Sequence, residues 1–200
     1  MPLPIRVAHQ IARKIDEARV GELKYLRPDG KSQVTFSYVG GKPKEVLNAI
    51  TAVPHDPRVS QKKVARDIYE VIIRPALAKF GFKINFKDTI CNGTGIWLVG
   101  GPAADTGLTG RKIVVDSYGG MARIGGGCFS GKDPTKVDRS GAYATRFVAK
   151  NIVASGMARR CEIQIAYVIG KPRPVSKSIE TFGTEKVSLQ KIEAYAEKLL

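Results

Sequence analysis

The chain has 200 residues, with 33 Lys or Arg against 18 Asp or Glu, so its formal net charge is +15 at pH 7. A composition of 43% hydrophobic and 26% charged residues is typical of a globular protein and excludes the disordered and collagen-like classes. No stretch approaches the roughly 18 consecutive apolar residues of a membrane-spanning helix, and the first residues lack the pattern of a signal peptide. We therefore expect a cytoplasmic protein with no membrane partner.

The positive charge indicates an anionic partner, which composition leaves open between nucleic acid, a membrane surface and a phosphorylated small molecule. Residues 1–95 carry 17 Lys or Arg against 9 Asp or Glu, and residues 96–200 carry 16 against 9, so the excess is 8 and 7. Such even spreading is equally typical of a solvated basic surface. The three cysteines have no C-x-x-C spacing, which predicts neither a disulfide framework nor a zinc site.

The first half of the chain has the pattern of helices on either side of a hairpin. Apolar residues at helical intervals predict one helix over residues 4–18 and another over residues 60–79. Alternating polar and apolar residues predict strands over residues 33–39 and 46–53. Gly40-Gly41 supplies the turn that joins these strands into a hairpin.

The second half begins with loops, because 12 of the 21 glycines fall within residues 93–131. Short apolar runs predict strands over residues 96–99 and 113–115, and Trp97 is expected in the core. A helix is expected to start near residue 138 or 140 and to end before residue 156. A strand over residues 161–167 and a last helix, capped by Ser188, follow.

Strands and helices in this repeated order predict an α+β fold with two units, each a β-sheet with helices. The change of texture near the middle of the chain places the boundary there. The expected domains are residues 1–95 and residues 96–200.

The stretch from Gly100 to Ser140 has the composition of a nucleotide site. Backbone amides of glycine-rich turns and nearby cations can hold phosphates, and carboxylates beside them can hold a magnesium ion. Magnesium-nucleotide is the ligand that this mixture favours. On composition alone, a glycine-rich surface loop is an equal alternative, in which Asp116 and Arg123 simply pair with each other.

Two short motifs, one inside this stretch and one before it, are misleading. Gly126 to Asp133 matches G-x-x-x-x-G-K but has Asp where a P-loop needs Ser or Thr on magnesium, and no buried strand precedes it. We therefore exclude a P-loop. Asn92-Gly-Thr is a formal glycosylation acceptor, which a cytoplasmic chain would not use.

Two long runs carry a more specific signal. The first is Gly100-Gly-Pro-Ala-Ala-Asp-Thr-Gly-Leu-Thr-Gly-Arg-Lys-Ile-Val-Val-Asp-Ser-Tyr-Gly-Gly-Met-Ala-Arg, and the second is Gly125-Gly-Gly-Cys-Phe-Ser-Gly-Lys-Asp-Pro-Thr-Lys-Val-Asp-Arg-Ser. In this order they resemble the signature region of the methionine adenosyltransferases, or S-adenosylmethionine synthetases. Pro2-Leu-Pro-Ile, Leu26-Arg-Pro-Asp-Gly-Lys-Ser-Gln-Val and Glu180-Thr-Phe-Gly-Thr extend the resemblance to nearly the whole chain.

The resemblance implies the fold of this family's central and C-terminal domains and a transferase that makes S-adenosylmethionine from ATP and L-methionine, with release of phosphate and diphosphate. It implies Mg²⁺ and K⁺ as cofactors, a role in one-carbon metabolism, and an oligomer. The implied catalytic residues are Arg111 and Lys132. The implied ATP-binding residues are Asp29, Lys31, Asp105, Arg111, Lys112, Cys128 and Lys132. The implied methionine-binding residues are Asp105 and Lys136, and the implied metal ligand is Asp138.

The chain departs from the family pattern at several positions. The family usually has Arg at the position of Ile96, His at Ile124, Gly at Ala104 and Ala at Cys128. At Cys128 we expect a backbone contact rather than a nucleophile. Trp97 stands where the family places an aromatic residue that stacks on the nucleotide. His9 and His55 lie outside the signature, so we assign them no role.

Whole segments of the family pattern have no counterpart in the chain. These are the amino-terminal His-Pro-Asp-Lys motif, the potassium-binding glutamate and the Gly-Asp-Gln-Gly loop. The resemblance therefore predicts a central domain without its first strand and a C-terminal domain that is incomplete at its end. Because sites of this family lie between subunits, we expect the chain to be inactive alone. A second protein chain that carries the amino-terminal half would be its partner, in a homo- or hetero-oligomer.

Two other functions remain open at this stage. The departures at Ile96 and Ile124 fit a catalytically inactive binding or assembly module that keeps the synthetase fold. The net charge alone suggests a nucleic-acid-binding module, but the chain has neither an RNP aromatic pattern nor a helix-turn-helix signature. We therefore expect no nucleic-acid partner.

Overall fold

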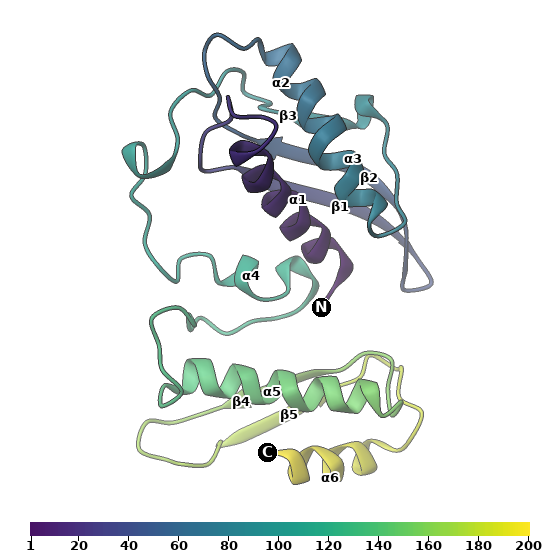
Figure 1. Cartoon of the computed structure of the whole chain (residues 1–200). Coiled ribbons are helices and arrows are strands. Elements are labelled where there is room, and N and C mark those ends of the chain that lie inside the picture. The colour runs from purple at the N-terminus through teal and green to yellow at the C-terminus, as the bar shows by residue number, and fades with distance from the viewer. The chain divides into compact units, whose positions relative to one another are not determined.

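The computed structural model describes residues 1–200, which form two compact units (Figure 1). The first unit contains Met1–Leu108 and Tyr118–Met121, and the second contains Thr109–Ser117 and Ala122–Leu200. Each unit combines a small sheet with helices, so the predicted α+β fold with two sheet-plus-helix units is confirmed. No helix is both long enough and apolar enough to cross a membrane.

The sheet of the first unit has three strands in the order β1-β2-β3. β1 (Lys31–Val39) and β2 (Lys42–Ala52) form an antiparallel hairpin, and β3 (Thr89–Cys91) pairs with β2 in parallel. Gly40 and Gly41 make the turn with φ of +56° and +75°, as the predicted hairpin requires. The sequence does not predict β3, because three residues are too few to show an alternating pattern.

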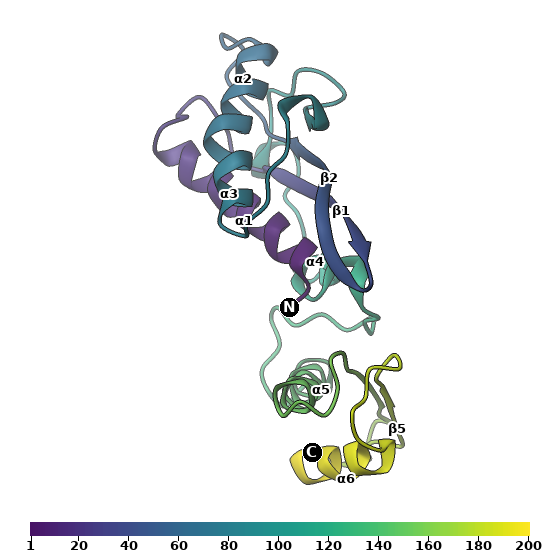
Figure 2. The same ribbon diagram turned by 90° about the vertical axis from the view of Figure 1, so that its right-hand side faces the viewer.

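Two long helical segments cover one side of this hairpin (Figure 2). The first is α1 (Leu3–Val20). The second runs through α2 (Gln61–Asp67), the π-helical η1 (Ile68–Ile73) and α3 (Arg74–Ala78). Both predicted helices are confirmed. The π-helical part ends directly before Arg74-Pro75, where proline supplies no amide hydrogen to the helical ladder.

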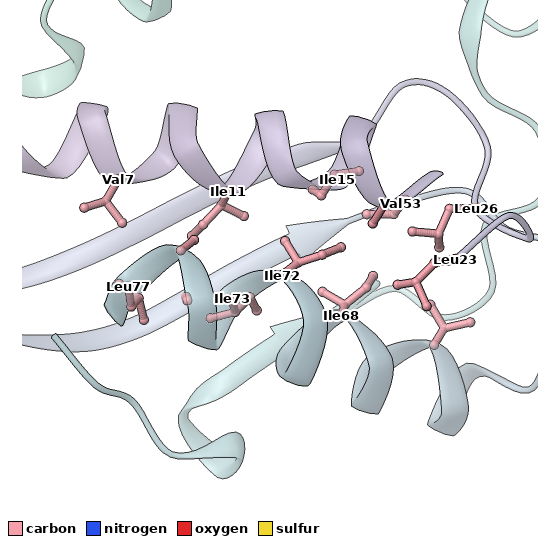
Figure 3. Packing of buried hydrophobic residues seen from close by; sticks show 14 of the residues in the cluster. Val7, Ile11, Ile15, Leu23, Leu26, Val53, Ile68, Ile72, Ile73 and Leu77 are labelled. Carbon is pink, nitrogen blue, oxygen red and sulfur yellow. The ribbon is translucent and has the colours of Figure 1, made fainter. Parts of the chain in front are cut away.

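The side chains of these helices meet in a buried core (Figure 3). Ile11 and Ile15 of α1 and Ile68 and Ile72 of η1 are at most 2% exposed. Burying each such side chain contributes about 1.5–3 kcal/mol. Because α1 also packs on β1, this core fixes the start of β1 and the turn that precedes it.

The second unit packs α5 (Val137–Ala154) and α6 (Leu189–Leu199) with an antiparallel pair of strands, β4 (Glu162–Ala166) and β5 (Ser176–Glu180). Its core contains Val148, Ile152, Ala158, Ile192 and Ala196. The predicted helices and the strand at β4 are confirmed. Ser188 occupies the N-cap of α6, but its side chain makes no capping hydrogen bond. β5 escapes prediction because its sequence is mostly polar and exposed.

Two predicted strands are wrong. Residues 96–99 lie in no strand, and residues 113–115 belong to the single helical turn α4 (Ile113–Asp116). Three or four apolar residues do not distinguish a strand from a helical turn. Three short 3₁₀ turns complete the chain: η2 (Phe86–Asp88), η3 (Gly101–Ala103) and η4 (Gly119–Met121).

Candidate active site

The turn before β1 carries two of the predicted nucleotide-binding residues, Asp29 and Lys31. Asp29 has a φ of +85°, a conformation that residues with side chains rarely adopt and that is enriched at functional sites. Its Oδ2 accepts a hydrogen bond from the amide of Gly101 at 3.4 Å. Gly30 presses against the core, since a Cβ there would lie 2.7 Å from Cγ2 of Ile15. The core therefore holds this turn in place.

Trp97 lies beside Lys31 and is only half-buried, so its prediction as a core residue is wrong. The Lys31 ammonium is 5.1 Å from the centroid of the indole ring, within the range of a cation–π contact. The indole Nε1 donates to the carbonyl of Val99 at 2.6 Å. The segment stays outside the sheet, which leaves the ring partly open to solvent. A half-exposed aromatic ring beside a lysine is suited to stacking on a nucleotide base.

Asp105 also belongs to the first unit. Its Oδ1 accepts a hydrogen bond from the amide of Gly107 at 2.9 Å, which closes a short turn. The residue is exposed, so the turn presents a carboxylate at the surface of the unit.

In the second unit, Gly110 allows the two runs of the signature to pack closely. Gly110 has a φ of +72°, and a Cβ there would lie 2.6 Å from Cβ of Cys128. The hydroxyls of Thr109 and Ser130 form a hydrogen bond beside this contact. The first signature run is thereby held against the second. The side chain of Cys128 packs against the backbone of Gly110, so a larger side chain at position 128 would disturb the packing.

Lys132 and Asp138 form an ion pair where the second signature run enters α5. The Lys132 Nζ donates to Oδ2 of Asp138, and this hydrogen bond raises the pKa of the lysine above its ordinary value. Asp138 lies in the first turn of α5, where a helix favours negative charge. A Cβ on Gly127 would lie 2.4 Å from Cγ of Asp138, so only glycine fits there. The glycine loop and α5 thus fix the carboxylate between them.

Lys136 forms a second pair with Asp133. Its Nζ lies 2.9 Å from Oδ2 of Asp133, while Thr135 donates to Oδ1 from both its amide and its hydroxyl. The Thr135 hydroxyl, then Lys136, lowers the pKa of Asp133 to about 2. Both side chains are exposed, so Lys136 remains accessible to a ligand.

Arg111 and Lys112 lie between the Gly110 contact and α4, and both are exposed. Arg123 does not pair with Asp116, as the alternative interpretation of the sequence expected. Its guanidinium Nε instead lies 3.0 Å from Oε1 of Glu162 at the start of β4. This pair ties the end of the first signature run to the sheet of the second unit.

The described residues contain no group of three or more His, Cys, Asp or Glu side chains that could hold a metal ion. Magnesium, however, is often held by one or two carboxylates together with substrate phosphates and water. The fixed carboxylate of Asp138 fits that role when a polyphosphate lies beside it.

The predicted site residues are divided between the two units. Three belong to the first unit and six to the second: Asp29, Lys31 and Asp105, and Arg111, Lys112, Cys128, Lys132, Lys136 and Asp138. In the first unit, Asp29 and Lys31 lie in and just after the turn before β1, and the segment that carries Trp97 lies beside this turn. In the second, Lys132 and Asp138 are in direct contact.

Three polar residues to which the sequence assigned no site role hold the surroundings of this segment. Arg27 donates to the carbonyl of Leu98, and the amide of His55 donates to the carbonyl of Trp97. Asn92 is 5% exposed, and its side chain bonds both backbone groups of Val53. His55 and Asn92 are buried and Arg27 is half-buried, and a single sequence carries no signal of burial at an isolated polar position.

The sequence matches two family descriptions. Residues 1–97 match the central domain of S-adenosylmethionine synthetase, and residues 99–200 match its C-terminal domain. Together with the two α+β units and the signature loops, these matches show that the chain belongs to the S-adenosylmethionine synthetase family.

A curated relative supports the same assignment. An S-adenosylmethionine synthase of Desulforudis audaxviator (strain MP104C) is 51% identical over 194 residues, which are 96% of this chain and 49% of the relative. The chain therefore spans about half the length of the curated relative that it matches.

Proposed function

We propose that the chain provides the polyphosphate-binding side of a site that makes S-adenosylmethionine from ATP and L-methionine. In this reaction a lone pair of the methionine sulfur forms a bond to C5′ of the ribose. The bond between C5′ and its oxygen breaks, and triphosphate leaves with that electron pair. Water then cleaves the triphosphate to diphosphate and phosphate. Fixed positive charge near the leaving group is the largest expected source of catalysis.

The observation that carries this proposal is the pair of Lys132 and Asp138 between the glycine loop and α5. The contact holds the ammonium beside the glycine loop, where an incoming phosphate can replace the carboxylate as its partner. Lysine is protonated at neutral pH, so Lys132 offers a full positive charge to a phosphate. Arg111 and Lys112, exposed on the adjoining run, are the further cations for the triphosphate.

Other residues take the roles that the family pattern assigns to them. Asp29 and Lys31 contact the nucleotide, with Trp97 beside them for the base. Asp105 and Lys136 contact methionine or the nucleotide next to it. Cys128 contributes through its backbone.

Asp138 would hold Mg²⁺ together with phosphate oxygens, and the ion would neutralise charge that develops on the leaving group. Potassium would be held by residues of the family that the 200 residues do not contain. The proposed domains remain residues 1–95 and 96–200.

The complete reaction requires the part of the family that this chain does not cover. We propose that a second protein chain with the amino-terminal half joins it in an oligomer. Mixing the purified chain with such a partner should yield S-adenosylmethionine from ATP, methionine, Mg²⁺ and K⁺. No product from any mixture in which both chains are folded would overturn this proposal.

A catalytically inactive assembly module is the second candidate. The observation in its favour is Ile96, which is 67% exposed at a position where the family usually has a charged residue. Calorimetric titration of the chain with a non-hydrolysable ATP analogue separates the two candidates. Magnesium-dependent binding supports the enzyme, whereas a folded chain that binds no nucleotide supports the assembly module.

A further inference from the structure

The segment from Trp97 to Gly101 belongs to no strand, yet three hydrogen bonds from the body of the first unit hold it. The amide of His55 donates to the carbonyl of Trp97 at 3.0 Å. The guanidinium Nη1 of Arg27 donates to the carbonyl of Leu98 at 2.6 Å. At its far end, the amide of Gly101 donates to Oδ2 of Asp29.

The same segment packs against the Arg27–Asp29 turn without space for a side chain. A Cβ on Gly100 would lie 2.4 Å from Cγ of Pro54 and 2.6 Å from the carbonyl oxygen of Pro28. Close backbone packing of this kind requires the segment and the turn to keep a fixed relative position. Arg27 helps to fix that position with two hydrogen bonds, because its own amide also donates to the carbonyl of Pro54 at 2.7 Å.

The orientation of the indole ring depends on this segment. The Trp97 Nε1 donates to Val99, two residues further along, so the ring turns with the local backbone. Leu98, the residue that Arg27 holds, lies between them. The ring in turn contacts Lys31, which is the first residue of β1 after the turn. Arg27 thus lies at the point where the segment, the turn and the ring are linked.

We propose that Arg27 is a positioning residue for the nucleotide: it contacts no substrate but fixes the segment that carries Trp97, and so sets the position of the ring beside Lys31. This inference rests on the proposed function. A half-buried guanidinium bonded to a carbonyl makes a charge-assisted hydrogen bond, which is among the stronger single contacts in a protein. Neither His55 nor Asp29 reaches the middle of the segment.

The chain contains a single tryptophan, so fluorescence excited at wavelengths that its seven tyrosines do not absorb reports on this ring alone. In the full chain, Arg27→Ala should shift the emission of Trp97 to longer wavelength and increase its quenching by acrylamide. Arg27→Lys keeps the charge on a shorter stem and should give an intermediate result. Arg58→Ala is the matched control, because Arg58 pairs with nearby Asp56 and its side chain is 88% exposed. It should leave the emission unchanged.

Titration with magnesium and an ATP analogue completes the test. Arg27→Ala should bind about tenfold more weakly than the unmodified chain, which corresponds to one strong hydrogen bond, while Arg58→Ala should bind equally well. Circular dichroism checks that each variant is folded. If Arg27→Ala does not fold, the fluorescence and nucleotide affinity of Arg27→Lys test the proposal instead.

The two possible failures are distinguishable. If the unmodified chain binds no nucleotide, the proposed function fails, and the fluorescence of the free variants still tests whether Arg27 positions Trp97. Unchanged emission and quenching in the folded Arg27 variants would overturn the inference. So would altered emission with unaltered nucleotide affinity.

Discussion

The Nζ atom of Lys132 donates a hydrogen bond to the carboxylate of Asp138, although the family pattern assigns the lysine to phosphate and the aspartate to magnesium. The side chains are 25% and 47% exposed, so a ligand can reach both. In the free chain each residue therefore neutralises the other. Binding of magnesium polyphosphate would separate the pair: Lys132 would then contact phosphate and Asp138 would contact magnesium.

This pairing predicts opposite effects for two substitutions. Lys132→Met should weaken binding of tripolyphosphate about tenfold or more, with or without Mg²⁺, because it removes a cation from the phosphate site. Asp138→Asn should strengthen binding without Mg²⁺, because the lysine loses its competing carboxylate. The same variant should lose most of the gain that Mg²⁺ provides. Isothermal titration calorimetry measures the tripolyphosphate affinity of each variant and of the unmodified chain, in the presence and in the absence of Mg²⁺.

Lys150→Met is the matched control, since Lys150 is an exposed lysine further along α5. It removes the same charge from the same unit, away from the glycine loop, and should change tripolyphosphate affinity little. Equal weakening by Lys150→Met and Lys132→Met would mean that only net charge matters, and the assignment of Lys132 would be wrong.

The sequence predicts well those elements whose own residues carry the pattern. α1 and the hairpin were predicted because their apolar residues recur with a helical or alternating period. β3 and β5 were missed because their pairing depends on a neighbouring strand rather than on their own composition. Residues 96–99 were mistaken for a strand because so short an apolar run does not define a secondary structure. In the structure, the carbonyls of Trp97 and Leu98 accept hydrogen bonds from His55 and Arg27 instead of from a strand.

The family motif predicts which residues belong to the site, but it does not predict which side chains contact one another. Spacing alone does not show that Lys132 and Asp138 neutralise each other, or that Arg123 pairs with Glu162 rather than Asp116. Such pairs depend on where the loops pack, and that packing is decided by Gly110 and Gly127. Glycine positions therefore deserve as much weight as charged ones when a loop site is predicted.

Gly110 tests this role of close packing. Gly110→Ala adds a Cβ that would lie 2.6 Å from Cβ of Cys128, at a φ of +72°. The left-handed conformation alone costs about 1–2 kcal/mol, and the clash adds to it. We expect a lower thermal midpoint together with weaker magnesium-nucleotide binding, because the two signature runs separate.

Gly107→Ala separates strain from the clash. Gly107 has a φ of +68°, but a Cβ there meets nothing within 4 Å. This variant should show only the cost of the left-handed conformation. Combining Gly110→Ala with Cys128→Gly should restore part of the binding, since it removes the atom that the new Cβ meets. A Gly110→Ala chain that matches Gly107→Ala in stability and binding would refute the packing role.

The buried hydrogen bonds of Asn92 should contribute to the stability of the first unit. Its side chain accepts from the amide of Val53 at 2.7 Å and donates to the carbonyl of Val53 at 3.1 Å, within a buried environment. Asn92 has a φ of +52°, so Asn92→Gly keeps the backbone relaxed and removes only the side chain. Leaving these buried groups unpaired should lower the free energy of unfolding by about 1–3 kcal/mol. Urea denaturation measures it.

The exposed Asn85 provides the comparison. Its side chain bonds only Asp88, three residues away, so Asn85→Gly should cost less than Asn92→Gly. A loss of stability for Asn92→Gly no greater than that for Asn85→Gly would contradict the role of Asn92 as a buried bridge.

The depressed pKa of Asp133 gives a pH-dependent prediction. Its value falls from the ordinary 3.8 to about 2, chiefly because of the Thr135 hydroxyl and then Lys136. A carboxyl whose pKa is lowered by folding stabilises the folded state above its unfolded pKa, and that contribution disappears as the pH falls through the folded value. Thr135→Val removes the hydroxyl, so the Asp133 pKa should rise toward 3.8, as carboxyl carbon NMR would show. The variant should be less stable than the unmodified chain above pH 3.8 and equally stable below about pH 2. Ser130→Ala, which leaves the Asp133 contacts intact, should not move that pKa; an unchanged Asp133 pKa in Thr135→Val would show that the hydroxyl does not bind the carboxylate in solution.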